Sequence, residues 1–117
     1  MNYDLEERTA VFSENIINLC KKVPQNVITK PVISQLLRSG TSIGANYMEA
    51  NGASSKKDFR SKIFICKKEC RETKYWLRLL AKTEDSFITE CKKLWAEVQE
   101  LTLIFSKIAI STKIDAK

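Results

Sequence analysis

Apolar residues in the second half of the chain recur at alternating steps of four and three residues. The spacing runs without a break from Phe59 to Leu80 and again from Phe87 to Ile108. The repeat positions are Phe59, Ile63, Cys66, Cys70, Thr73, Leu77 and Leu80, then Phe87, Cys91, Leu94, Val98, Leu101, Phe105 and Ile108. Such a repeat keeps its apolar residues on one side of a helix, and a sustained period of seven favours left-handed supercoiling. The sequence therefore predicts two long amphipathic helices.

Two further helices are predicted in the first half, where apolar residues also follow the helical period. Pro24 ends the first because proline cannot continue the hydrogen-bond ladder, and Gly52 ends the second. Thr29 is predicted to cap the second helix, and Ser54 or Ser55 the third. The predicted helices span about residues 5–23, 31–51, 55–82 and 86–111. Short loops between them predict an all-α fold, a single antiparallel up-down-up-down four-helix bundle with left-handed packing, forming one domain over residues 1–117. A long isolated coiled coil is the competing architecture, which the two interruptions disfavour.

Two glycines lie four residues apart inside the second predicted helix, at Gly40 and Gly44. Each costs a helix up to about 1 kcal/mol relative to alanine. Small residues at this spacing predict the close approach of a neighbouring helix.

The net charge of +6 is concentrated in one part of the chain. Residues 51–82 carry ten Lys and Arg against three acidic residues, a net charge of +7, whereas the rest of the chain is nearly neutral. The basic residues that follow one side of the third predicted helix are Lys56, Lys57, Arg60, Lys67, Arg71, Lys74 and Arg78. This stripe is predicted to contact the phosphates of a nucleic acid, with an affinity that falls as salt rises. The alternative is a solvated helix surface with no ligand.

The same helix carries a second apolar line outside its core positions, formed by Ile65, Trp76 and Leu79. Exposed apolar patches mark interfaces, where aromatic residues are enriched. We therefore predict a homo-oligomer that uses these residues. The alternative is that the core of a monomer extends around this helix.

Catalytic and cofactor chemistry has little support in the sequence. The chain has no histidine, which removes the commonest general base, and its three glycines form no phosphate-binding motif. Its four cysteines continue the apolar spacing and are predicted to be buried thiols rather than zinc ligands. No apolar run is long enough to span a bilayer, and the acidic N-terminus does not resemble a signal peptide. We expect a cytoplasmic protein without enzymatic activity, metal, cofactor or membrane partner.

A polar line climbs the second predicted helix in steps of four, four and three residues, and two glutamates on the third helix are its predicted partners. These residues are Arg38, Ser42, Asn46, Glu49, Glu69 and Glu72. They are predicted to form a partly buried structural network, because a buried charge requires a partner. The alternative is an exposed stripe with weak pairs between successive helical turns.

The stretch from Arg38 to Ala50, which reads RSGTSIGANYMEA, resembles the core signature of the 23S rRNA intervening-sequence four-helix-bundle proteins. The resemblance continues through Ser55–Phe59, Lys68–Thr73 and Tyr75–Leu77. It implies a compact four-helix protomer that assembles, as in known relatives, into a ring-like homopentamer. Some relatives are encoded within insertions in 23S rRNA genes, and a related retroelement accessory protein is thought to bind nucleic acid. By this resemblance the polar line matches the family's motif positions.

Together these observations predict a non-enzymatic, oligomeric four-helix bundle that binds RNA or another nucleic acid through its basic third helix. A protein-interaction scaffold with no role in nucleic-acid binding is the alternative.

Overall fold

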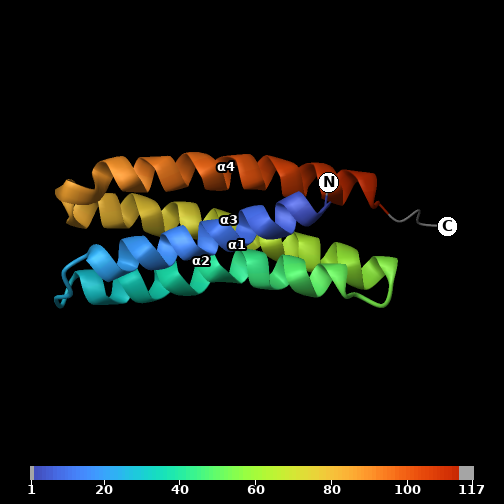
Figure 1. Ribbon diagram of the computed structural model, residues 1–117, viewed down its shortest axis with the longest axis horizontal. Coiled ribbons are helices and arrows are strands. Elements are labelled where there is room, and N and C mark those ends of the chain that lie inside the picture. The colour runs from blue at the N-terminus through green and yellow to red at the C-terminus, as the bar shows by residue number, and fades with distance from the viewer. Residues whose placement is uncertain (1, 114–117) are drawn as a thin grey trace.

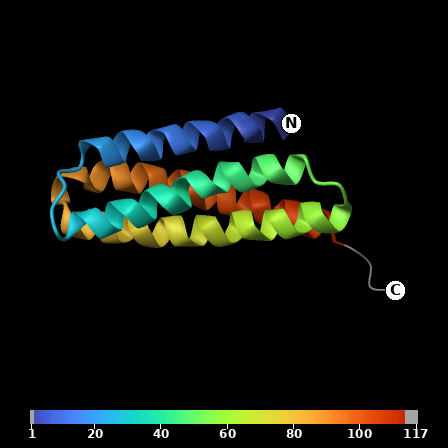
Figure 2. The same cartoon turned by 90° about the horizontal axis from the view of Figure 1, so that it is seen from below.

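The computed structural model describes residues 2–113, which form four α-helices and a short 3-10 turn. The helices are α1 (Asn2–Lys22), α2 (Thr29–Asn51), α3 (Lys56–Thr83) and α4 (Ile88–Ser111), and the turn η1 (Asp85–Phe87) precedes α4. The chain reverses direction at each connection, so the four helices run side by side in an elongated bundle (Figures 1 and 2). The predicted all-α four-helix bundle is therefore confirmed. The left-handed packing stays a prediction.

The loop before α2 differs from the predicted cap. Thr29 is already the first helical residue rather than the N-cap. The Asn26 carboxamide accepts hydrogen bonds from the backbone N–H groups of Ile28 and Thr29, each at 2.9 Å. The Thr29 hydroxyl points back into the loop, where it donates to the Pro24 carbonyl at 2.7 Å. The Asn26 side chain thus accepts hydrogen bonds from N–H groups at the start of α2. The helix begins at Thr29, two residues before the predicted start at residue 31.

The start of α3 agrees with the prediction. Ser55 is the N-cap residue, and its hydroxyl accepts a hydrogen bond from the Asp58 N–H at 3.0 Å. This contact satisfies one of the N–H groups that a helix N-terminus leaves without an internal partner.

The core of the bundle consists of the residues that the apolar spacing selects on each helix. Within it Tyr47 and Phe105 pack together near the C-terminal ends of α2 and α4, with ring centroids 5.8 Å apart. The largest fully buried side chains are Tyr47, Phe12, Phe105, Ile16, Leu19, Leu36, Ile43, Ile63, Leu77, Leu80, Leu101 and Val98. Phe59, Phe87, Leu94 and Ile108 lie at the ends and edges of the predicted seams and are only partly buried.

The glycines of α2 lie against α1. A Cβ atom at Gly40 would lie 2.9 Å from Cγ1 and 3.0 Å from Cγ2 of Ile16. At Gly44 a Cβ would lie 3.2 Å from the Oγ1 atom of Thr9. The predicted close approach of a neighbouring helix therefore exists, and that neighbour is α1.

Helix α1 has an extensive contact with α2 and a much smaller one with α4. Ion pairs cross the looser side: the guanidinium of Arg8 donates to both carboxylate oxygens of Glu97 at 2.7 and 2.8 Å. Arg8 also pairs with Glu100 at 2.6 Å, and Lys22 pairs with Glu90 at 2.9 Å. Charged side chains thus connect α1 to α4 where apolar packing between the two helices is sparse. Within residues 2–113, no helix is both long and apolar enough to cross a membrane.

Candidate nucleic-acid interface

The basic stripe predicted from the sequence lies along the side of α3 that faces α4. Lys56, Lys57, Arg71 and Arg78 are exposed, whereas Arg60, Lys67 and Lys74 are half-buried. Lys56 and Lys57 occupy the first turn of α3, where the helix dipole disfavours positive charge. Their position therefore does not stabilise the helix.

Phe64 lies among the basic residues of this side and is 43% exposed. The guanidinium carbon of Arg60 lies 4.7 Å from the centre of its ring, and the Lys67 ammonium lies 5.2 Å from it. Cations attracted to an aromatic ring in this way lose conformational freedom. Two members of the stripe are therefore held in place by one exposed ring.

Lys74 is held in a similar way by α4. Its ammonium donates to the Gln99 side-chain oxygen at 2.7 Å and lies 5.4 Å from the centre of the Trp95 ring. Arg60 also contacts α4, because its Nε donates to the Ala109 carbonyl at 3.2 Å, near the C-terminus of that helix. The apolar and basic spacings in the sequence do not select Trp95, Gln99 or Ala109. Periodicity does not reveal which residues of one helix face a given side of another.

A shallow depression of about 370 Å³ lies in the middle of this side. It is lined by Phe64, Lys67, Lys68, Arg71, Lys74 and Thr102. Four of its six lining residues are therefore basic, and one is aromatic. We call the surface formed by Arg60, Phe64, Lys67, Lys68, Arg71, Lys74 and Trp95 the basic–aromatic face.

The polar line predicted on α2 divides into separate contacts. The Arg38 guanidinium pairs with Glu69 at 3.3 Å and with Glu72. The hydrogen bond and charge of Glu69 raise the pKa of Arg38. The Glu69 side chain is only 7% exposed, and its Oε1 atom makes no hydrogen bond to another described residue. These three residues form a cluster that connects α2 to α3.

The other members of that line lie outside the cluster. The Ser42 hydroxyl donates to the Arg38 carbonyl, and the Asn46 carboxamide donates to the Ser42 carbonyl, so both bond within their own helix. Glu49 pairs with Lys62 of α3 at 2.7 Å. The structure therefore brings together three of the six residues, and a fourth connects the same two helices at another point.

The three residues predicted to form an oligomer interface are all half-buried in the protomer. Trp76 and Leu79 pack against the edge of the core, whereas Ile65 is not among the side chains packed there. Tyr75 lies beside Trp76 with the two rings nearly perpendicular and their centroids 5.1 Å apart, and it is exposed. An apolar strip thus remains at the surface next to the Arg38 cluster.

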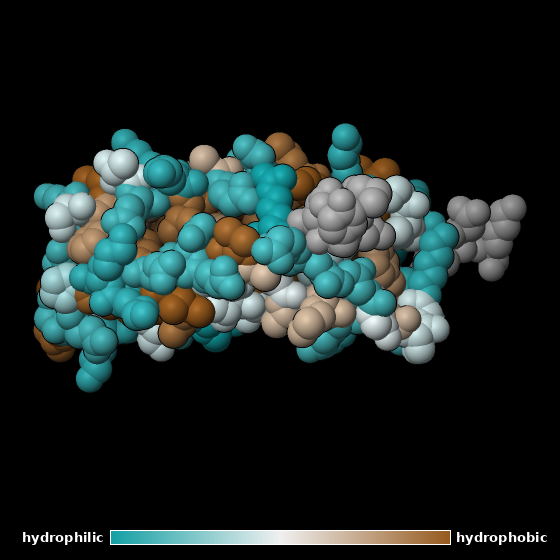
Figure 3. Space-filling model, viewed as in Figure 1, coloured by the Kyte–Doolittle hydropathy of each residue, from teal (hydrophilic) through white to brown (hydrophobic). Residues whose placement is uncertain are grey.

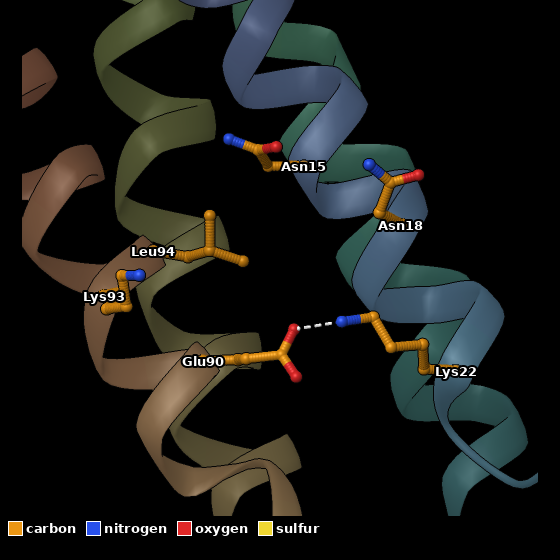
Figure 4. Close-up of a pocket in the computed structure, with 6 residues that line it drawn as sticks. All are labelled: Asn15, Asn18, Lys22, Glu90, Lys93 and Leu94. Atoms are coloured by element: carbon orange, nitrogen blue, oxygen red, sulfur yellow. Dashed lines mark hydrogen bonds and ion pairs between the residues drawn. The ribbon is translucent and has the colours of Figure 1, made fainter.

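A groove lies between α1 and α4, where hydrophobic side chains are visible among the hydrophilic ones (Figure 3). One part of it, about 420 Å³, is lined by Val11, Phe12 and Leu94 together with Arg8, Asn15, Lys93 and Glu97. The adjoining part, about 260 Å³, lies next to the Lys22–Glu90 pair (Figure 4). The two parts share Asn15, Lys93 and Leu94, so they form one continuous groove.

The four cysteines are buried as free thiols. Burial raises the pKa of Cys66 and Cys70 to about 12 and that of Cys20 and Cys91 to about 11. At neutral pH they are therefore neutral thiols with little nucleophilic character. In the part of the chain that the structure describes, no group of three or more Cys, Asp or Glu residues is arranged to hold a metal ion.

Comparison with known proteins finds a matching family model and similar solved structures. Residues 1–107 match the sequence model of the 23S rRNA-intervening sequence proteins. Among solved structures, the chain is similar to a protein of unknown function from the S23 ribosomal protein family of Bacteroides thetaiotaomicron VPI-5482. The two chains are 35% identical, their TM-score is 0.79, and the match covers 89% of this chain and 96% of the other. No curated protein matches this chain.

Proposed function

We propose, from the premise that this chain belongs to the 23S rRNA-intervening sequence protein family, that it is a cytoplasmic, non-enzymatic bundle that binds RNA. The proposed contact surface is the basic–aromatic face, extended along α3 by Lys56, Lys57 and Arg78. Such a surface contacts phosphates and follows the shape of the nucleic acid rather than reading the edges of the bases.

The observation that supports this proposal is the separation of charge within the bundle. Every acidic residue of α4, namely Glu90, Glu97 and Glu100, pairs with a basic residue of α1. On α3, Glu69 and Glu72 pair with Arg38 of α2, on the opposite flank from the basic stripe. Among the described residues, Lys62 is the one basic residue of segment 51–82 that pairs with a carboxylate, that of Glu49.

Uncompensated positive charge on a folded surface attracts polyanions and releases their condensed counterions on binding. The nine remaining basic residues of segment 51–82, ten less Lys62, therefore provide a sequence-independent source of affinity. Among polyanions we propose RNA, because the family to which the chain belongs is described as 23S rRNA-intervening sequence proteins.

A filter-binding titration against a structured RNA at several salt concentrations tests the proposal. Affinity should fall steeply with salt, and reversing Arg71 and Arg78 to Glu should weaken binding and reduce the slope of log affinity against log salt by about 2. Reversing Lys21 and Lys30, which are exposed on α1 and α2, makes the same change in net charge and serves as the control. Affinity that is independent of salt, or unaffected by the Arg71 and Arg78 reversals, would contradict the proposal.

Gln99→Glu offers a sharper variant because it changes no basic residue. The Gln99 oxygen already accepts from Lys74 at 2.7 Å, so a carboxylate there would pair with the ammonium in the same geometry. RNA affinity should fall while the free energy of unfolding stays within about 1 kcal/mol of the original, because the new ion pair would replace an existing hydrogen bond at a site that solvent still reaches. An unchanged affinity would show that Lys74 does not contact the ligand.

We also propose that the protomers assemble into a homo-oligomer, a pentamer by family resemblance, through the strip that contains Ile65, Trp76 and Leu79. Light scattering should give a multiple of the 13.4 kDa protomer mass. Ile65→Glu should lower that mass, whereas Met48→Glu, at a more exposed apolar position of α2, should not. A monomeric mass for the original chain would overturn this assembly.

A protein-interaction scaffold is a second candidate, favoured by two apolar side chains on the outer surface of α4. Leu103 and Ile110 are 58% and 74% exposed. This function predicts an assembly that persists at high salt and an absence of RNA binding at any salt concentration.

A further inference from the structure

The basic–aromatic face combines two kinds of contact that only an unpaired nucleotide satisfies together. Its aromatic rings, Phe64 on α3 and Trp95 on α4, are 43% and 41% exposed. Each ring already has basic side chains near it, Arg60 and Lys67 at Phe64 and Lys74 at Trp95. From this arrangement we infer that the preferred ligand is single-stranded RNA, with bases stacked on Phe64 and Trp95. The inference rests on the RNA-binding function proposed above.

An RNA duplex can use only part of this surface. Its bases are stacked on each other, so a duplex presents phosphates, sugar hydroxyls and groove edges, and a side chain cannot stack on a base. The lysines and arginines of the face would contact duplex phosphates, but the exposed rings would gain nothing. Loops, bulges and ends expose the faces of their bases, and proteins bind such nucleotides by combining a basic groove with aromatic platforms.

The cation contacts of Phe64 and Trp95 fit this mode of binding. A cation–aromatic contact at an exposed site is weaker than the stacking of a base on an aromatic side chain. A base that displaces the Lys67 ammonium from Phe64 leaves that ammonium beside the sugar-phosphate backbone of the same strand. The lysine thus exchanges a ring for a phosphate, and no buried group loses a partner.

The depression beside Phe64 has the dimensions for such a contact. Its volume of about 370 Å³ lies within the range of pockets that hold small ligands. Four basic side chains surround the single ring that lines it. A base stacked on Phe64 would therefore have positive charge close to its phosphates on several sides.

Fluorescence anisotropy with a single-stranded RNA oligonucleotide and a duplex of the same length tests the inference. Phe64→Leu should weaken single-strand binding roughly five- to hundredfold, the range that loss of one stacked base produces. It should weaken duplex binding much less, because a duplex loses only the ring contacts that hold Arg60 and Lys67. Its salt slope should match that of the original chain because no charge is removed. Tyr75→Leu is the matched control: Tyr75 is exposed on the same helix, and its described ring contact is with Trp76 rather than with a basic side chain. This control should bind both RNAs as the original chain does.

A second measurement follows the other ring directly. In the Trp76→Phe variant Trp95 is the sole tryptophan of the chain, so its fluorescence reports stacking at that position. Single-stranded RNA should quench it at saturation, and duplex RNA should leave it nearly unchanged. Equal weakening of both RNAs by Phe64→Leu, or no effect on either, would overturn the stacking. If both RNAs bind with equal affinity and the same salt slope, RNA binding stands and only the single-strand preference fails. If neither binds, the RNA-binding function itself fails.

Discussion

Alanine substitutions at the three glycines should change stability in different directions, because the space around each glycine differs. In a helix interior, Gly→Ala stabilises by up to about 1 kcal/mol through backbone propensity. At Gly40 the added methyl would lie 2.9 Å from Cγ1 and 3.0 Å from Cγ2 of Ile16, which is fully buried and cannot move away. Overpacking of this kind costs about 1–3 kcal/mol. The Gly40→Ala variant should therefore be less stable than the original chain by about 1 kcal/mol.

Gly52→Ala is the control with open space. The nearest atom to a Cβ there is the Glu49 carbonyl oxygen at 3.8 Å, and the φ angle of Gly52 is −96°, which alanine adopts readily. This variant should be more stable than the original by about 0.4–1 kcal/mol, since alanine reduces the entropy of the unfolded chain. Gly44→Ala, 3.2 Å from Thr9, should fall between the two.

Substitutions at Ile16 test whether its contact with the added methyl causes the loss of stability in Gly40→Ala. Ile16→Ala removes both Cγ atoms, so its cavity cost of about 2–5 kcal/mol should be partly relieved when the Gly40→Ala methyl fills the space. The two changes should be coupled by about 1 kcal/mol or more. Ile16→Val keeps both Cγ atoms and removes only Cδ1, which would lie 3.3 Å from the added methyl, so its coupling should be much smaller. Urea unfolding followed by circular dichroism gives these values, at one fixed protomer concentration because the proposed assembly would add to the stability of the folded chain. A Gly40→Ala variant more stable than the original, with no coupling to Ile16→Ala, would refute the steric argument.

Three further variants or conditions test other contacts. Arg8→Met should cost at most about 1 kcal/mol in urea unfolding, because the Arg8 side chain is 36% exposed, and high salt should reduce that cost. Ser55→Ala should cost about 1 kcal/mol in the same assay through loss of the α3 cap, and Ser54→Ala should cost less. The pKa of Cys66 and Cys70 is raised from 9.0 to about 12, so folding favours the neutral thiols. The contribution of these thiols to stability should be complete below about pH 9. Between about pH 9 and pH 12 it should fall by up to about 1.4 kcal/mol per pH unit for each thiol. A urea midpoint that does not fall over this range would contradict the burial of the thiols.

The sequence was sufficient for the fold because each helix carries its own apolar period and its own boundaries. In the first half of the chain, apolar residues at the helical period are buried, and Ser55 caps α3 as expected. These buried residues are Leu5, Phe12, Ile16 and Leu19 of α1 and Ile33, Leu36, Ile43, Tyr47 and Ala50 of α2. The spacing of Gly40 and Gly44 also predicted a close helix contact. The hydrogen bonds that Asn26 accepts from the start of α2 were missed because Thr29, a common capping residue, lies three residues later and its hydroxyl bonds to the loop instead.

The candidate site was predictable only on α3. The stripe from Arg60 to Arg78 follows from the geometry of a single helix. Trp95 and Gln99 lie beside it only because of how α4 is rotated about its own axis relative to α3. The pairing of Arg8 with Glu97 joins residues 89 positions apart, and no local pattern selects it. The same limitation explains Glu49, which spacing grouped with Arg38 although its actual partner is Lys62.

The rotation of α4 therefore connects the fold to the proposed function. The core seam of this helix, which includes Val98 and Phe105, fixes which of its sides faces α3. With that seam buried, Glu97 and Glu100 face Arg8 of α1, and Gln99 is the residue opposite Lys74. A rotation by one residue position, about 100°, in one of the two directions would place the carboxylate of Glu100 there instead. The positive charge of the basic–aromatic face is thus maintained by apolar packing on the other side of the helix. Core substitutions that rotate α4 should reduce RNA binding even though they leave every basic residue in place.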